Sequence, residues 1–254
     1  MEVYQNIKWE IIEDGIGLLT LNRPQAYNSI NGVMLDDLQR FWETRLYDLD
    51  TAVIMLQGAG EKGFCSGLDI KWTISNSDTR IPDKGYAFQA KLGRINLAMR
   101  RVPQPIICMV HGAAVGQGFS MALASDIRII SEDARFCAGY INIGLGGADM
   151  ACSYFLPRLI GAGRAYEFMY TGEFMSSAEA VDLGLVSKRV ERAQLYEVGL
   201  QYAKTLCSKN SLALRLTKEA INMNLDAGGL EQALNMEDRN QILLSMSFGL
   251  KSTV

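Results

Sequence analysis

The first two thirds of the chain alternate short apolar runs with stretches of helical periodicity. Residues 16–21, 52–56, 105–110 and 126–130 are apolar runs with the length of a buried strand. A helix is expected to open at Asn31-Gly32, with apolar positions at Leu35, Leu38, Trp42 and Leu49. Further helices are expected over about 85–101 and 119–124. Strands that alternate with helices favour crossover connections, so the pattern predicts an α/β fold with a largely parallel sheet.

The last third of the chain has a different pattern. From Arg164 onward the periodicity is purely helical, residues 176–179 have the form of a capping box, and Gly184 stands where a helix stop is expected. We therefore expect an α/β core over residues 1–190 and a C-terminal helical lid or oligomerisation region over 191–254. Within the core, residues 73–84 are polar and lack periodicity, which predicts a mobile loop.

Two glycine-bearing turns, each at the end of an apolar run, carry the strongest chemical signal. One is EKGFCSGLDI at residues 61–70, and the other is HGAAVGQG at residues 111–118. Glycine lets the backbone approach a ligand closely, and two such turns side by side can direct two backbone N–H groups at one point. A pair of this kind forms an oxyanion hole, which stabilises negative charge as it develops on a carbonyl oxygen.

In this order and with this spacing, the two turns resemble those of the crotonase superfamily, also called the enoyl-CoA hydratase/isomerase family. The resemblance extends over roughly residues 16–244 and includes the segments 22–31, 156–161, 170–172 and 180–186. It implies a crotonase (ClpP/crotonase-like) fold of repeated ββα units and an acyl-CoA substrate, with no cofactor besides the coenzyme A that the substrate carries. Because this fold supports many reactions on acyl-CoA thioesters, the reaction has to be argued from the site.

The resemblance places the two oxyanion donors on the backbone N–H groups of Ser66 and Gln117. The positions around them are then expected to lie at the substrate: Cys65, Gly67, Leu68, Asp69, Gly116 and Ser120. The thiol of Cys65 itself is expected to be buried and inert, and Asp69 to fix its turn. Gln117 departs from the family, which usually has glycine there, so its side chain is expected to narrow the pocket.

Hydratases of this family use two glutamates, and the resemblance puts their positions on Ser120 and Tyr140. A serine hydroxyl does not ionise, and an ordinary tyrosine has a pKa of about 10, so neither residue supplies a general base at neutral pH. The two-glutamate mechanism of hydration is therefore unavailable to this chain.

Asp149 is the acidic residue of the loop that the family places over the substrate. Its surroundings resemble two branches of the family: the dienoyl-CoA isomerases, where an aspartate of this loop is a base, and the 4-chlorobenzoyl-CoA dehalogenases, where it is a nucleophile. In the second branch a tryptophan stands at the position of Tyr140. Asp149 also precedes a predicted helix, and aspartate is a preferred N-cap, so a purely structural role stays open.

Three functions follow from these residues. In the first, Ser66 and Gln117 polarise a thioester carbonyl while Asp149 transfers a proton, as in the isomerisation of an unsaturated acyl-CoA. In the second, Asp149 acts as a nucleophile or directs water, which gives hydrolysis or dehalogenation of an acyl-CoA or aryl-CoA. In the third, the chain is a non-catalytic homologue that binds acyl-CoA without turnover.

The composition of the chain restricts the kinds of partner and metal site that can be expected. The net charge is −3 and Lys and Arg are dispersed, so there is no basic footprint for nucleic acid or an anionic membrane. Five cysteines, an odd number without CxxC spacing, argue against a disulfide framework or a zinc site and favour a reduced, cytoplasmic setting. The only histidine, His111, excludes a multi-histidine metal site and is expected to be structural. No apolar run approaches the length of a membrane span.

The resemblance also implies a homotrimer or a dimer of trimers, in which C-terminal helices contact neighbouring subunits. Five apolar positions would be difficult to bury on one subunit: Leu230, Leu234, Ile242, Leu243 and Leu244. In the family a final helix near the coenzyme A usually follows the position of Ser247. Residues 249–254 are too short for that helix, so we expect part of the coenzyme A contact to be lacking.

Overall fold

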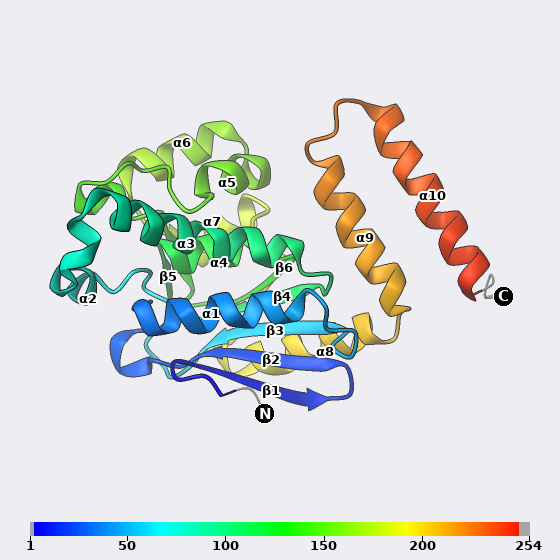
Figure 1. Ribbon diagram of the computed structural model, residues 1–254, viewed down its shortest axis with the longest axis horizontal. Coiled ribbons are helices and arrows are strands. Elements are labelled where there is room, and N and C mark those ends of the chain that lie inside the picture. Colours follow the sequence, from blue (N-terminus) through cyan, green and yellow to red (C-terminus); the bar gives the residue numbers. More distant parts are fainter. Residues whose placement is uncertain (1–2, 249–254) are drawn as a thin grey trace.

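The computed structural model describes residues 3–248, and a six-stranded sheet lies at its centre (Figure 1). The order of the strands is β1-β2-β3-β4-β6-β9. They are β1 (Ile7–Glu13), β2 (Ile16–Leu21), β3 (Val53–Gly58), β4 (Ile106–Val110), β6 (Ile127–Ser131) and β9 (Lys188–Val190). β1 is antiparallel to β2, and all the other neighbours are parallel. The prediction of an α/β fold with a largely parallel sheet is confirmed.

A second sheet of three strands, in the order β5-β7-β8, lies beyond the ends of the first. It contains β5 (Ala113–Val115), β7 (Arg135–Cys137) and β8 (Met175–Ser176). β5 directly follows β4, and β7 directly follows β6, so the chain twice steps from the large sheet into the small one. The second glycine turn lies at one of these steps.

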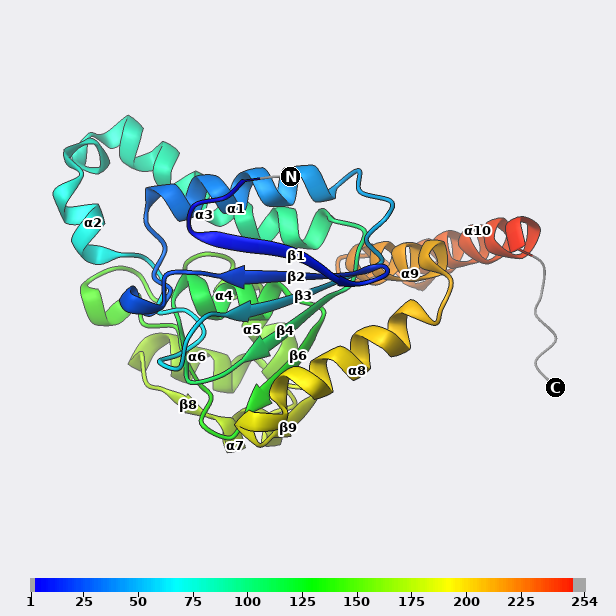
Figure 2. The same ribbon diagram turned by 90° about the horizontal axis from the view of Figure 1, so that it is seen from below.

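Helices cover both faces of the large sheet (Figure 2). On one face lie α1 (Gly32–Arg45), α3 (Pro82–Arg101) and α4 (Gln117–Ala124), and on the other lies α8 (Leu195–Cys207). The face toward α8 forms its own buried cluster, which includes Ile16, Val53, Met55, Ile107, Met109, Ile129, Leu195 and Ala203. Because both faces are covered, β2 and β4 are buried along their whole length, which explains their continuous apolar sequences.

α1 begins as predicted but ends earlier. The side chain of Asn31 caps the helix by accepting a hydrogen bond from the N–H of Met34 (2.9 Å). The helix ends at Arg45, and Leu49 lies beyond it with 75% of its surface exposed, so its assignment to the apolar face was wrong. The carboxylate of Asp48 folds a turn there by accepting from the N–H groups of Asp50 and Thr51.

Residues 73–84 are helical, so the prediction of a mobile loop was wrong. α2 (Ile70–Ser75) is followed by a 3-10 turn at Ser77–Arg80, and α3 begins at Pro82. Polar side chains account for these starts: Asp69 accepts from the N–H of Trp72, and Asn76 accepts from the N–H of Asp78. Capping of short helices leaves no apolar period in the sequence.

The later helices are α5 (Cys152–Ile160), α6 (Ala162–Thr171) and α7 (Ser177–Asp182). The predicted capping box is present, because the Ser176 hydroxyl accepts from the N–H of Glu179 while the Glu179 carboxylate accepts from the N–H of Ser176. Gly184 follows α7 with a φ of +71°, as expected of a helix stop.

α9 (Ser211–Asn224) and α10 (Leu230–Phe248) lie side by side and project from the sheet layers (Figure 1); we call them the C-terminal arm. Buried Lys218 ties α9 to the core through an ion pair with Asp126 (2.9 Å). In the described part of the predicted region 191–254, residues 191–248, α8 packs on the sheet whereas α9 and α10 project. The expectation about residues 249–254 lies outside the described residues. No helix between residues 3 and 248 is long and apolar enough to cross a membrane.

Candidate active site

The two glycine turns lie against each other, as predicted. Cys65 and Ala114 form a parallel bridge, in which the N–H of Val115 donates to the carbonyl of Cys65 (2.9 Å). Gly67 has a φ of +84°, and a Cβ at this position would lie 2.8 Å from the carbonyl oxygen of Val115. The close approach of the two turns therefore requires glycine at position 67.

One predicted donor is engaged elsewhere. The N–H of Ser66 donates to the carbonyl of Tyr27 (3.0 Å), so the assignment of this group to the oxyanion hole was wrong. The neighbouring Leu68 forms a parallel bridge with Ile30, in which Ile30 bonds the carbonyl of Gly67 and the N–H of Asp69. In such a bridge the central residue directs its own N–H to the opposite side. The Leu68 N–H accordingly has no acceptor among residues 3–248.

The second predicted donor is free. Gln117 is the first residue of α4, where a backbone N–H has no partner within the helix, and none of the described residues accepts from it. Gly116 turns the chain into the helix with φ +53° and ψ −120°. The Gln117 nitrogen lies only 3.4 Å from the place that a Cβ on Gly67 would occupy, so the two turns present Leu68 and Gln117 as neighbours.

These two residues line a cavity of about 130 Å³. Its apolar lining residues are Leu68, Ile70, Val115, Ile143, Leu145 and Met150, and its polar lining residues are Ser66, Gln89, Gln117, Tyr140 and Asp149. Gly67 and Gly116 also line it, as predicted. Asp149 is the only carboxylate among these lining residues.

Three residues predicted at the substrate lie behind the cavity wall instead. Cys65 is fully buried, with its Sγ 3.1 Å from the carbonyl oxygen of Asn28, and burial raises the pKa of its thiol to about 12. Asp69 caps α2 and pairs with Arg23 (3.0 Å), so its role in fixing the turn is what the structure shows. Ser120 is buried on α4 and reaches the cavity only through its contact with Tyr140.

Ser120 and Tyr140, at the two glutamate-like positions, bond each other. Their hydroxyl oxygens lie 2.9 Å apart, and both side chains are buried. Burial raises the pKa of Tyr140 well above its ordinary value, and the hydrogen bond with Ser120 only partly opposes this shift. The pair is therefore a neutral hydroxyl pair at neutral pH, with no carboxylate.

Asp149 is half-buried and held through one of its oxygens. Its Oδ1 accepts from the Nε2 of Gln89 (2.7 Å) and from the N–H of Met150 (2.7 Å), whereas its Oδ2 has no partner within residues 3–248. α5 begins at Cys152, and its N-cap is Ala151 without a side-chain hydrogen bond. Asp149 is therefore no helix cap, and that alternative was wrong.

The side-chain amide of Gln117 turns toward α3. It pairs with the amide of Asn96, with nitrogen-to-oxygen distances of 3.2 and 3.3 Å. The expected narrowing of the pocket by this amide is therefore not observed, because its polar end is buried against α3. Gln89 and Asn96 could not be recognised in the sequence, since an amide side chain on a helix has no local signature of its contacts.

His111 lies outside this cavity. It is buried after β4, and its Nε2 has no partner among the described residues. Burial, followed by the charge of Arg192, lowers its pKa, so the ring is neutral at neutral pH. Its backbone carbonyl accepts from the N–H of Phe64 (2.8 Å) and joins the two turns, in keeping with the expected structural role. No cluster of three or more metal-binding side chains occurs within the described residues.

Comparison with known proteins identifies the family. The model of the enoyl-CoA hydratase/isomerase family matches residues 11–246 of this chain. The chain belongs to that family. A probable enoyl-CoA hydratase of Mycobacterium leprae is 35% identical over 234 residues, which are 91% of this chain and 79% of the relative. The 1,2-epoxyphenylacetyl-CoA isomerase of Escherichia coli is 30% identical over 236 residues, covering 93% and 89%.

A solved structure shows the same fold. The crystal structure of a putative enoyl-CoA hydratase from Streptomyces coelicolor A3(2) superposes with a TM-score of 0.93 at 29% identity, covering 98% of this chain and 89% of that one. The predicted crotonase fold and family are thus confirmed. This member of the enoyl-CoA hydratase/isomerase family is an enzyme of the lyase or isomerase type, since its relatives are named hydratases or isomerases and a hydratase is a lyase. Family membership therefore disfavours the alternative of a non-catalytic homologue.

Proposed function

We propose that this enzyme isomerises an unsaturated acyl-CoA, with Asp149 as the proton-transfer group. One observation carries the proposal: Asp149 is the only carboxylate lining the cavity that also contains two neighbouring backbone N–H groups without acceptors among the described residues. Isomerisation of an unsaturated thioester requires hydrogen-bond donors at the thioester oxygen and a base near the acyl carbons. This cavity contains both.

The N–H groups of Leu68 and Gln117 would hold the thioester oxygen. When a proton leaves a carbon of the acyl chain, negative charge moves to this oxygen, and donors already directed at it need no reorganisation. The position of Gln117 at the start of α4 adds the favourable partial charge of a helix N-terminus. Loss of one donor of this kind typically lowers the rate by a factor of about 100 to 1,000.

Asp149 would move the proton. Its Oδ1 is fixed by two hydrogen bonds, which leaves Oδ2 as the oxygen that can take a proton from one carbon and return it to another. Removal of a proton from one acyl carbon breaks its C–H bond and gives an enolate. Return of a proton to a different carbon then leaves the double bond in a new position. No water is consumed, so the scheme works without the two glutamates of a hydratase.

The free Oδ2 also supports a second function, in which Asp149 attacks the acyl or aryl group as a nucleophile. Attack on a halogenated aryl carbon would form an aryl ester of Asp149 and expel a halide ion, whereas attack on the thioester carbonyl would form a mixed anhydride and expel coenzyme A. Water would then hydrolyse either intermediate. Free coenzyme A or a halide ion would be released. Isomerisation releases neither, so the two functions differ in their products.

A screen of acyl-CoA thioesters in deuterated water, read by mass spectrometry, tests the proposal. Isomerisation gives deuterium in the recovered acyl-CoA without addition of water or loss of coenzyme A. Addition of water would indicate a hydratase, and free coenzyme A or halide would favour the nucleophilic function. Recovery of every acyl-CoA with both its deuterium content and its double-bond position unchanged, across straight-chain, branched and aromatic unsaturated acyl groups, would contradict the isomerase proposal.

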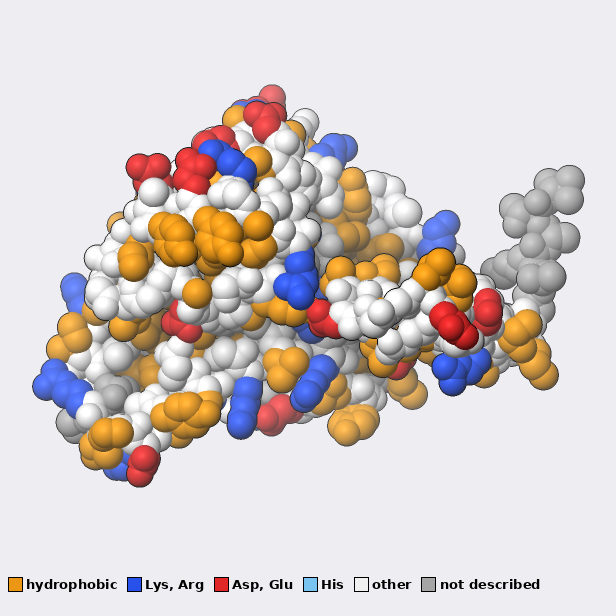
Figure 3. All heavy atoms as spheres, turned by 90° about the horizontal axis from the view of Figure 1, so that it is seen from above, with side chains coloured by type: hydrophobic (Ala, Val, Ile, Leu, Met, Phe, Trp, Pro, Cys, Tyr) orange, Lys and Arg blue, Asp and Glu red, His pale blue; other side chains and the backbone are white. Residues whose placement is uncertain are grey.

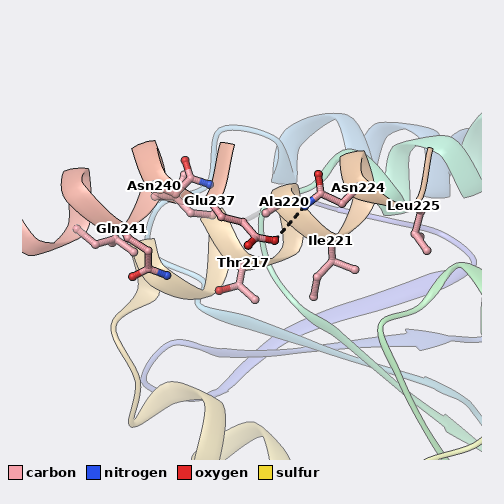
Figure 4. A pocket seen from close by; sticks show the side chains of 10 residues that line it. Thr217, Ala220, Ile221, Asn224, Leu225, Glu237, Asn240 and Gln241 are labelled. Atoms are coloured by element: carbon pink, nitrogen blue, oxygen red, sulfur yellow. Dashed lines mark hydrogen bonds between the residues drawn. The ribbon is translucent and has the colours of Figure 1, made fainter. Parts of the chain in front are cut away.

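We also propose that the enzyme assembles as a homotrimer or a dimer of trimers through the C-terminal arm. Hydrophobic side chains are visible along the projecting helices (Figure 3), and Leu230, Leu234, Ile242 and Leu243 of α10 are all exposed. Between α9 and α10 lies a groove of about 450 Å³, shown in Figure 4, where Thr217, Ile221 and Leu225 follow one another along α9 to its C-terminal end. Exposed apolar surface of this extent is typical of a protein–protein contact.

A further inference from the structure

One face of α3 contacts both halves of the candidate site. Gln89 and Asn96 are seven residues apart, which is two turns of an α-helix, so their side chains extend from the same face. Gln89 bonds the carboxylate of Asp149, and Asn96 bonds both Gln117 and the backbone of Met150. The helix thus connects the donor turn to the loop that carries the carboxylate.

The contacts of Asn96 define the orientation of its amide. The side chain is fully buried, and its Nδ2 donates to the carbonyl of Met150 (2.8 Å) and to the Oε1 of Gln117 (3.3 Å). Because Met150 offers a carbonyl, only the nitrogen of the Asn96 amide can face it. The Oδ1 then accepts from the Nε2 of Gln117 (3.2 Å). Both the nitrogen and the oxygen of the Asn96 amide therefore have hydrogen-bond partners.

The backbone that Asn96 holds is strained. Met150 and Ala151 have φ values of +49° and +64°, in the left-handed region that residues other than glycine rarely adopt. Such residues persist only where surrounding contacts fix them. The bond from Asn96 to the Met150 carbonyl is such a contact, and it lies one residue from Asp149.

We infer that Asn96 is a positioning residue, which fixes the loop of Asp149 relative to the Gln117 N–H. The inference rests on the proposed function, in which one reacting group contacts both. Without the bond to Met150, the strained loop can relax and move the carboxylate. Displacement of a reacting group by about 1 Å can lower the rate a hundredfold.

A pair of variants separates positioning from stability. Asn96→Leu leaves the Met150 carbonyl and the Oε1 of Gln117 without partners, and the Nε2 of Gln117 keeps only its long bond to the carbonyl of Leu92 (3.5 Å), so the variant lowers the melting temperature. Asn96→Leu combined with Gln117→Leu replaces the amide pair by apolar contact and recovers most of that loss, yet the Met150 carbonyl stays unanchored. We expect kcat of the double variant to stay about a hundredfold below wild type, with KM for the acyl-CoA little changed.

Gln104→Leu is the matched control. Gln104 is another fully buried amide, and it bonds the carbonyls of Arg45 and Asp48 away from the cavity. This variant should lose melting temperature and keep the wild-type kcat, which would show that destabilisation alone does not reduce turnover. Recovery of wild-type kcat together with melting temperature in the double variant would overturn the inference, because Asn96 would then act only through stability.

Hydrogen–deuterium exchange of the peptide covering residues 144–152 provides a readout that needs no substrate. In the double variant this peptide should exchange faster than in wild type, while β3 exchanges at the wild-type rate. Equal exchange of the peptide in the two proteins would refute the inference whether or not the enzyme turns over. Wild-type protein without activity on any acyl-CoA would instead refute the proposed function, and the exchange result would still decide the role of Asn96.

Discussion

The hydroxyl oxygens of Ser120 and Tyr140 lie 2.9 Å apart, so the two side chains at the glutamate-like positions satisfy each other. A pair of glutamates could supply a general acid and a general base, whereas this hydroxyl pair is neutral and buried. The polar chemistry of the cavity therefore depends on the Asp149 carboxylate and on backbone N–H groups.

Asp149→Asn should lower turnover about a hundredfold or more, the loss expected for a general base. Stability should change little, because an asparagine Oδ1 can still accept from Gln89 and from the N–H of Met150. Single-turnover kinetics and a thermal melt measure the two effects. Ser120→Ala serves as the comparison and should lower turnover only slightly. Near-full activity in Asp149→Asn would exclude both the isomerase and the nucleophile functions.

Gly116→Val should abolish activity while most of the fold persists. The glycine has φ +53° and ψ −120°, which a β-branched residue cannot adopt without strain, so the donor turn would have to move. Gly163→Val is the matched control, because a Cβ at Gly163 would meet no atom within 4 Å. Circular dichroism checks the fold. Equal activity in the two variants would show that the turn does not contact the reacting carbonyl.

The pair of Arg23 and Asp69 should make stability depend on pH in the acid range. Burial raises the pKa of Asp69, but hydrogen bonds from Trp72 and Arg23 outweigh it and leave the pKa below its ordinary value. The stabilisation is therefore present above the ordinary pKa of 3.8 and is lost as the pH falls through the lower folded-state pKa. Asp69→Asn should cost about 1 kcal/mol at pH 7.

Denaturant melts of wild type and Asp69→Asn at several pH values measure this dependence. The difference between their free energies of unfolding should be constant from pH 7 to about pH 5 and shrink below about pH 4. A difference that stays constant down to pH 2 would mean that the carboxylate charge contributes nothing. Asparagine remains a good N-cap, so the capping of α2 is retained in the variant.

Sedimentation of the wild-type enzyme should reveal a trimer or a hexamer at micromolar concentration. Ile242→Lys together with Leu243→Lys should shift it toward the monomer, because two charges would have to be buried in the contact. Tyr86→Lys is the control, since Tyr86 is exposed and lies in the first turns of α3, which begins at the end of the molecule opposite the C-terminal arm (Figure 1). A stable wild-type monomer would contradict the proposed assembly.

The fold and one of the two proposed donors could be predicted from the sequence, because apolar runs and glycine turns depend on local chemistry. The donor at Leu68 could not. Ser66 and Leu68 both flank Gly67, and only their pairing with Tyr27 and Ile30, far away in the sequence, decides which N–H is free. The contact between Gln89 and Asp149 likewise depends on the tertiary fold, because the two residues are sixty positions apart in the sequence.

The proposed oxyanion donors belong to the main chain, and this separates two properties of the enzyme. A substitution of Leu68 changes the shape of the apolar wall but does not delete the N–H at that position. Charge stabilisation is thus encoded in the path of the backbone, while the preference for an acyl group is encoded in replaceable side chains. Descendants of this chain could acquire new substrates by single substitutions without first losing the two proposed donors.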